Sequence, residues 1–191
     1  ELGYTPDQIV IVKVARLFHL KGHEYLVRAA EQVVQTVPNA RFLLVGDGIL
    51  QDRIRRQIET AGLAEHFQFT GLVPPERIPE LLAASDLVVH ASLREGLARV
   101  LPQALIAGKP VISFDVDGTR QVVLPNETGF LVPPRNATAL AKAIVRLATS
   151  GELRTRLGSQ GRARFANAFG HQQMTADIRG LYLRLLQGAK A

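Results

Sequence analysis

The chain has 191 residues, of which 47% are hydrophobic, so it is long enough for one sizeable α/β domain or two small ones. Without cysteine it forms neither disulfides nor thiolate metal sites, and no apolar run approaches the ~20 residues needed to cross a bilayer. A net charge of +6 suits an anionic partner, which could be nucleic acid, an anionic membrane surface or a phosphorylated small molecule.

Short apolar runs alternate with segments of helical spacing along the chain. The runs lack polar alternation for the most part and predict strands buried on both faces, at residues 9–14, 41–46, 67–71, 86–90, 110–114 and 129–132. Helices are predicted at residues 25–37, 50–61, 77–85, 96–108, 136–149, 151–168 and 171–187. This order predicts one Rossmann-like, three-layer α/β domain with a six-stranded parallel sheet and a C-terminal helical tail.

Positive charge gathers just after the first predicted strand. Arg16, His19, Lys21 and His23 surround Gly22 in the stretch VARLFHLKGHE. In doubly wound sheets, ligands bind at the carboxyl ends of the strands, where helix N-termini point inward. The position therefore favours a phosphate site, although a solvated loop would show the same pattern.

Two other strand ends carry candidate motifs. Glu95 and Gly96 come directly before a helical pattern, and Gln103 lies about two turns further on. Glu95 could contact a ligand, or it could merely stabilise the helix dipole. The turn 46–48 reads as a tight strand-to-helix connection. Neither GxGxxG nor GK[ST] occurs, which argues against a dinucleotide oxidoreductase and a P-loop ATPase.

Together these motifs resemble the C-terminal, donor-binding domain of the family 4 (group 1) retaining glycosyltransferases, one half of a GT-B fold. The resemblance rests on VARLFHLKGH, LLVGDG, FTGLVP, AASDLVVHASLREG and GFLVPPRNATALAKAI, in register with the Glu95…Gln103…Gly108-Lys109-Pro110-Val111 stretch. Gln103 stands where the family usually has a second Glu, and His90 stands where many members have Pro. Such departures would mark a subfamily or an altered choice of donor.

The resemblance implies a role for each site candidate. Arg16 and Lys21 would bind the diphosphate of a nucleotide sugar, and Glu95 would contact the hydroxyls of the donor sugar; these three are the catalytic candidates. The remaining candidates bind substrate: the amides of Gly96, Leu97 and Ala98 over sugar and phosphate, Gln103 at the ribose, backbone near Leu72 and Val73 at the base, and His19 near a phosphate.

The same resemblance predicts transfer of a hexose with retention of configuration, no cofactor and no metal. Residues 1–170 would form the nucleotide-sugar-binding domain, and residues 171–191 a helix that crosses back to a missing N-terminal, acceptor-binding domain. The chain alone would then be inactive. Expected partners are the donor, the missing domain and an anionic membrane surface, with a cytoplasmic location at the inner face of the membrane. The donor sugar, base and acceptor stay open.

Two other functions compete with this hypothesis. One is a nucleotide-sugar epimerase of the same fold. The other is a non-catalytic basic module that binds nucleic acid or an anionic membrane, but only 6% of the residues are aromatic, which disfavours a nucleic-acid partner. Two metal-like patterns, Asp115 with Asp117 and His19 with His23, are interpreted as coincidental.

Overall fold

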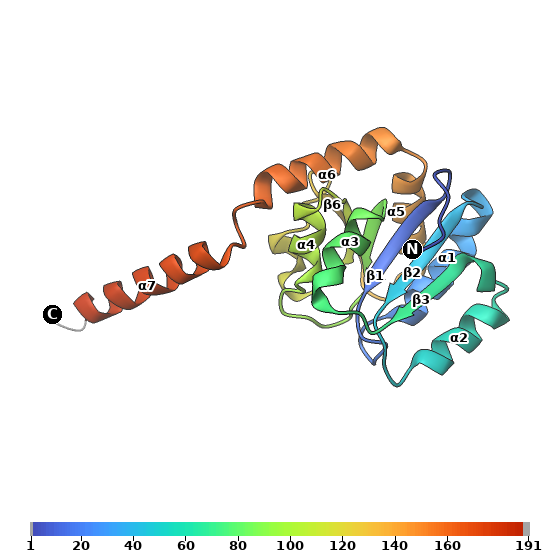
Figure 1. Cartoon of the computed structure of the whole chain (residues 1–191), viewed down its shortest axis with the longest axis horizontal. Coiled ribbons are helices and arrows are strands. Elements are labelled where there is room, and N and C mark those ends of the chain that lie inside the picture. Colours follow the sequence, from blue (N-terminus) through green and yellow to red (C-terminus); the bar gives the residue numbers. More distant parts are fainter. Residues whose placement is uncertain (1, 189–191) are drawn as a thin grey trace.

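The structure, a computed structural model, describes residues 2–188 and shows one parallel sheet with helices on both faces (Figure 1). The six strands lie in the order β3-β2-β1-β4-β5-β6. All predicted strands are present, as β1 (Ile9–Val14), β2 (Ala40–Val45), β3 (Phe67–Gly71), β4 (Leu87–His90), β5 (Val111–Phe114) and β6 (Gly129–Val132). The predicted Rossmann-like α/β fold is therefore confirmed.

The helices form a layer on each face of the sheet. Their bounds are α1 (His23–Thr36), α2 (Gln51–Thr60), α3 (Ile78–Ala83), α4 (Val100–Ile106), α5 (Ala137–Ala148), α6 (Gly151–Phe165) and α7 (His171–Gly188). Short 3₁₀ turns precede β3 and α3 (η1, Ala64–His66; η2, Pro75–Arg77) and follow β5 (η3, Asp117–Gln121). One apolar core joins the sheet to α1, α2 and α5, and a second joins it to α3 and α4.

The strands are buried on both faces, which explains why apolar and polar residues do not alternate along them. All six residues of β1 pair in register with β2, and on its other side β1 pairs with β4. Ile11 belongs to the core under α1, whereas Val10 and Val12 belong to the core under α3 and α4. Because both faces are covered by helices, successive residues are apolar whichever way they point.

Helix α4 is shorter than its sequence predicts. The predicted helix spanned residues 96–108, but α4 begins at Val100 and residues 93–99 form a loop. Contacts across the chain hold that loop: the Glu95 amide donates to Asp117 Oδ2 at 2.6 Å, and the Gly118 amide donates to the Gly96 carbonyl at 3.1 Å. Backbone groups that a helix would have used are thereby committed to η3.

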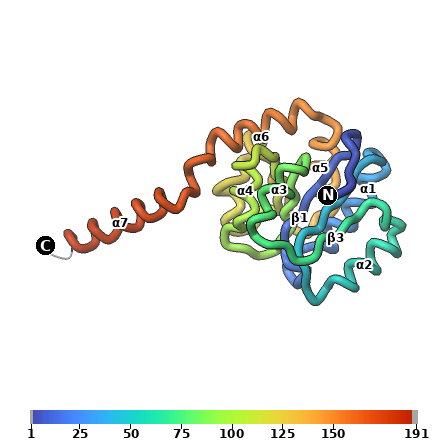
Figure 2. The backbone as a smooth tube through the Cα atoms, in the orientation of Figure 1, coloured from blue at the N-terminus to red at the C-terminus, as the bar shows by residue number. Residues whose placement is uncertain are grey.

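Helix α7 leaves the body of the molecule (Figures 1 and 2). It has no buried residue, and Ile178, Leu181 and Leu185 are all exposed. Helix α6, by contrast, packs on α4 and α5, with Leu157 and Phe165 buried. Within residues 2–188, none of the helices is both long and apolar enough to span a membrane.

Candidate functional site

A cavity of about 310 Å³ opens at the carboxyl edge of the sheet. The loops that follow β1, β3 and β4 line it, together with the first turns of α4. Six of the ten predicted site residues line this cavity: Arg16, Lys21, Val73, Glu95, Ala98 and Gln103. Residues from four separate segments thus meet at the place where parallel sheets bind ligands.

The loop after β1 is fixed by close packing against the end of β4. Gly22 has φ +66°, and a Cβ there would lie 1.9 Å from the Ala91 carbonyl oxygen. The Leu93 amide donates to the Leu20 carbonyl at 2.8 Å. Only a glycine allows this approach, because it tolerates positive φ and has no side chain. The packing sets Lys21 directly beside the loop that carries Glu95.

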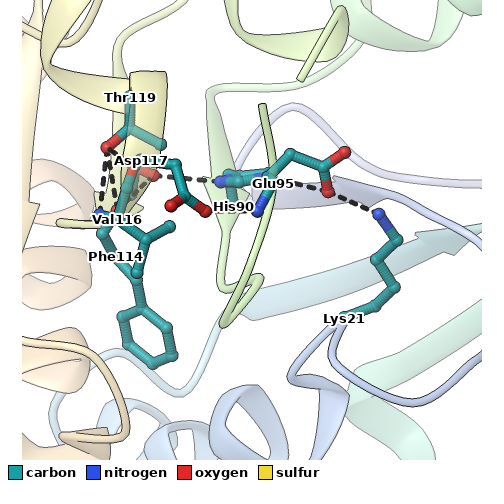
Figure 3. A network of polar contacts seen from close by, with 8 residues as sticks. Lys21, His90, Glu95, Phe114, Val116, Asp117 and Thr119 are labelled. Carbon is teal, nitrogen blue, oxygen red and sulfur yellow. Dashed lines mark hydrogen bonds and ion pairs between the residues drawn. The ribbon is translucent and has the colours of Figure 1, made fainter. Parts of the chain in front are cut away.

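Lys21 and Glu95 form an ion pair across the cavity, in which Lys21 Nζ donates to Glu95 Oε2 (Figure 3). Both side chains are about three-quarters buried. On the far side, the Glu95 amide is bonded to Asp117, so the network runs from β1 through the loop after β4 to η3. The dipole explanation for Glu95 finds no support in this geometry, because α4 begins only at Val100 and Lys21 holds the carboxylate.

Four predicted site residues lie outside the cavity lining. His19 is exposed and packs edge-on against Phe18, with ring centroids 5.5 Å apart. Leu72 is 77% exposed, Gly96 is exposed, and Leu97 packs against the second core. The amides of residues 96–98 precede α4 and are not its first turn, so the expectation of helix-start amides at that point is wrong.

The glycines of the turn 46–48 face the loop after β1. A Cβ on Gly46 would lie 2.4 Å from the Ala15 carbonyl oxygen, and one on Gly48 would lie 2.4 Å from the Leu17 carbonyl oxygen. Leu17 also donates its amide to the Asp47 carbonyl at 2.6 Å. This supports the interpretation of a tight turn, whose effect on the site is to brace the loop that carries Arg16.

The two aspartates of the D-x-D pattern already have partners. The Arg120 guanidinium donates to both Asp115 oxygens, at 2.6 and 2.5 Å, and it lowers the pKa of that carboxyl. Asp117 accepts from the Glu95 amide. Over residues 2–188, no group of three or more His, Asp or Glu side chains gathers as metal ligands would. His23 and His19 differ in setting, since the first is buried and the second exposed.

The structure adds buried polar residues to the predicted site residues. His90 and Ser92 line the cavity and are 3% and 1% exposed. Burial, together with the charges of Lys13 and Lys21, lowers the pKa of His90 to about 3. Lys13 lies beneath the loop after β1, 1% exposed, and burial lowers its pKa to about 7. For Lys13, the sequence shows one sign of this setting, which is a lysine inside the apolar run IVIVKV.

Comparison with known proteins identifies the family of this chain. The sequence profile described as "Glycosyl transferases group 1" matches residues 1–164. The chain belongs to this family. It is 35% identical over 153 residues to 2-deoxystreptamine N-acetyl-D-glucosaminyltransferase of Streptomyces fradiae, covering 79% of this chain and 36% of that one. It is 27% identical over 176 residues to alpha-D-kanosaminyltransferase of Streptomyces kanamyceticus, covering 92% and 46%.

Solved structures of other proteins resemble the whole domain. Sucrose-phosphate synthase from Thermosynechococcus elongatus has a TM-score of 0.87 at 30% identity, over 96% of this chain and 47% of that one. HepE of Anabaena, solved in complex with UDP and glucose, has a TM-score of 0.82 at 29% identity, over 91% and 48%. The chain therefore spans less than half the length of these relatives, and it corresponds to one half of a GT-B fold.

Proposed function

We propose that this chain is the donor-binding half of a retaining glycosyltransferase and binds a uridine-diphosphate sugar in the cavity between β1 and β4. The Lys21–Glu95 ion pair in that cavity is the observation that carries the proposal, because it sets a cation for phosphate beside an acceptor for hydroxyls. HepE, which was solved with UDP and glucose, supplies the choice of uridine. The relatives reported above are named as transferases, which favours transfer over epimerisation.

Arg16 and Lys21 bind the diphosphate in this proposal. Both line the cavity, Arg16 at its exposed edge and Lys21 further in. Negative charge develops on the diphosphate as the glycosidic bond breaks, so fixed cations stabilise the transition state more than the ground state. An ammonium has three N–H donors, so Lys21 can hold Glu95 and a phosphate oxygen at the same time.

Glu95 binds the donor sugar, and the ion pair with Lys21 holds its carboxylate in place. A carboxylate accepts hydrogen bonds from hydroxyls more strongly than a neutral oxygen does. Gln103, on the α4 side of the cavity, accepts from the ribose, and Val73 faces the base. Ala98 lines the same wall.

The reaction proceeds without a metal ion in this proposal. Its support is that Asp115 and Asp117 are engaged by Arg120 and the Glu95 amide, which leaves Arg16 and Lys21 to balance the charge of the diphosphate. We place the enzyme in the cytoplasm, at the inner face of the membrane, because the chain is basic, with a net charge of +6.

In this proposal residues 1–170 form the donor domain and α7 (His171–Gly188) reaches to the acceptor-binding half of the enzyme, while residues 1 and 189–191 lie outside the described part of the chain. The support is that α7 begins at His171 and exposes Ile178, Leu181 and Leu185. An unpartnered apolar face of this kind marks an interaction surface. We expect the chain alone to bind the donor but not to transfer its sugar, since the acceptor half is needed to close the active cleft.

Isothermal titration with UDP and UDP-glucose tests the proposal. We expect both to bind equally well in EDTA and in magnesium. Arg16→Ala and Lys21→Ala should each weaken UDP binding about tenfold or more, as expected for one lost charge-assisted contact of about 1.5–3 kcal/mol. Lys142→Ala, which removes an exposed charge from α5, is the control and should change nothing.

Three outcomes would count against the proposal. Strict dependence on magnesium would overturn the metal-free mechanism and return attention to Asp115 and Asp117. Equal losses in the Arg16, Lys21 and Lys142 variants would indicate diffuse attraction to a basic surface rather than a site. Binding to DNA that disappears with added salt, without any binding of UDP, would favour the basic module instead.

A further inference from the structure

His90 presents a bare ring nitrogen to the cavity. It is the last residue of β4, is 3% exposed and lines the cavity beside Ser92 and Glu95. Its Nδ1 lies 3.0 Å from Ser113 Oγ, while its Nε2 has no hydrogen-bond partner among residues 2–188. A buried polar atom of this kind calls for a ligand or a water, because leaving it unpaired destabilises the protein.

The hydrogen bonds of Ser113 decide which nitrogen of His90 carries the proton. Ser113 Oγ donates its single hydrogen to the Phe114 carbonyl at 2.8 Å. It therefore has no hydrogen left for His90 and must accept one from Nδ1. In the neutral ring the other nitrogen, Nε2, is then an acceptor with a free lone pair.

The ring stays neutral at physiological pH. Burial raises the cost of the charged form, and Lys13 and Lys21 repel a second proton, so the pKa of His90 falls to about 3. Glu95 is the acidic group that faces His90, and its Oε2 lies 4.0 Å from Nε2. That carboxylate is held by Lys21, and two acceptors cannot bond to each other.

We infer that His90 is a specificity-determining residue whose Nε2 accepts a hydrogen bond from a hydroxyl of the donor sugar, next to the hydroxyl that Glu95 accepts. The inference rests on the proposed function. His90 would then recognise sugar hydroxyls and would not bind phosphate, because a ring nitrogen without a hydrogen cannot donate to a phosphate oxygen. Ser92, with its hydroxyl also unpaired at the cavity wall, supplies a second polar contact beside it.

Two substitutions distinguish the effect of the hydrogen-bond acceptor of His90 from the effect of the shape of its ring. His90→Phe keeps an aromatic ring and removes the acceptor. His90→Gln offers an amide oxygen near the place of Nε2. We expect the phenylalanine variant to weaken UDP-glucose about tenfold while UDP binds unchanged, and the glutamine variant to recover most of the loss. The same titrations at pH 6 and pH 8 should give the same ratio of the two dissociation constants.

A series of UDP-glucose analogues, each lacking one hydroxyl of the glucose, locates the contact. Against the wild type, one analogue should bind about tenfold more weakly because it leaves Nε2 unpaired. Against His90→Phe, that same analogue should bind as well as UDP-glucose does, because the contact is already absent. If every analogue loses as much in the variant as in the wild type, His90 contacts none of the hydroxyls, and the inference fails.

The tautomer provides a test that needs no variant. Nitrogen NMR of the ¹⁵N-histidine-labelled chain should show His90 protonated at Nδ1 only, from pH 5 to 8. Protonation at Nε2, or equal weakening of UDP and UDP-glucose by His90→Phe, would overturn the inference and indicate a phosphate contact. Failure of the unmodified chain to bind UDP at all would instead refute the proposed function. The NMR spectrum would still decide which nitrogen of His90 is protonated.

Discussion

Lys13 is the buried group whose removal should change the stability of this protein most. It lies in the middle of the sheet on β1, 1% exposed, and its Nζ has no hydrogen-bond partner among residues 2–188. Burial is the main cause of its low pKa, followed by repulsion from Lys21, while Glu24 and Glu95 act in the opposite direction. At neutral pH the folded protein therefore holds Lys13 partly deprotonated, whereas the unfolded chain holds it protonated.

The cost follows from the two pKa values. They are about 7 in the fold and 10.5 ordinarily, and each tenfold difference in proton affinity is worth about 1.4 kcal/mol. This difference between the folded and unfolded pKa thus destabilises the fold by about 4 kcal/mol at pH 7. Because the unfolded state binds more protons, stability rises with pH between 7 and 10.5, and the cost falls to about 2 kcal/mol at pH 9.

Lys13→Met removes the amine while it retains the length of the side chain. We expect a gain of about 4 kcal/mol in the free energy of unfolding at pH 7 and about 2 kcal/mol at pH 9. Urea unfolding followed by circular dichroism measures both, and the slopes with urea should match the wild type. Lys142→Met, on the exposed side of α5, is the control, with a change of about 0.5 kcal/mol or less.

A variant no more stable than the wild type at pH 7 would refute this reasoning. It would mean that Lys13 is charged in the fold and compensated by Glu24 or Glu95, since breaking a buried ion pair destabilises a protein. A gain that did not shrink between pH 7 and pH 9 would contradict the assignment of the effect to protonation.

Three further changes have expected outcomes. Gln103→Glu should keep or improve UDP affinity by titration, because a carboxylate accepts from both ribose hydroxyls, and clearly weaker binding would remove Gln103 from the ribose. Gly22→Ala should cost over about 3 kcal/mol in urea, since its Cβ would lie 1.9 Å from the Ala91 carbonyl oxygen, whereas Gly62→Ala, at φ +68° in open space, should cost about 1 kcal/mol. Deleting residues 171–191 should leave the melting temperature within about 2 °C, because no residue from 171 to 188 is buried, and a larger fall would show that α7 packs on the domain.

The strands could be predicted from sequence because their signal is local. Residues 9–14, 67–71 and 129–132 match the observed strands at both ends, since a strand covered on both faces is apolar throughout. The start of α4 could not be predicted in the same way. It depends on the bond from the Glu95 amide to Asp117, which lies 22 residues away along the chain.

From the sequence, site residues could be predicted only where their position just after a strand was enough to place them at the cavity. Arg16, Lys21 and Glu95 follow predicted strands, so the sheet rule brings them to one edge, and the family resemblance gives them roles. His19 follows the same strand yet stays outside the cavity, because the path of a loop is not set by periodicity. His90 is marked in the sequence only as a departure from the Pro of many family members, because its protonation depends on the bonds that Ser113 makes.

The strand order explains why the Lys21–Glu95 pair forms where it does. In the order β3-β2-β1-β4-β5-β6, the strands β2 and β3 lie on one side of β1, and the strands β4, β5 and β6 lie on the other side. After β1 the chain enters α1 on one face of the sheet, and after β4 it enters α4 on the other face. The two loops therefore separate above the sheet and leave a crevice between them, and the Lys21–Glu95 ion pair lies in the lining of that crevice. The topology places these two charges. In the proposed function, discrimination between donor sugars therefore comes from neighbouring residues in the cavity lining, such as His90.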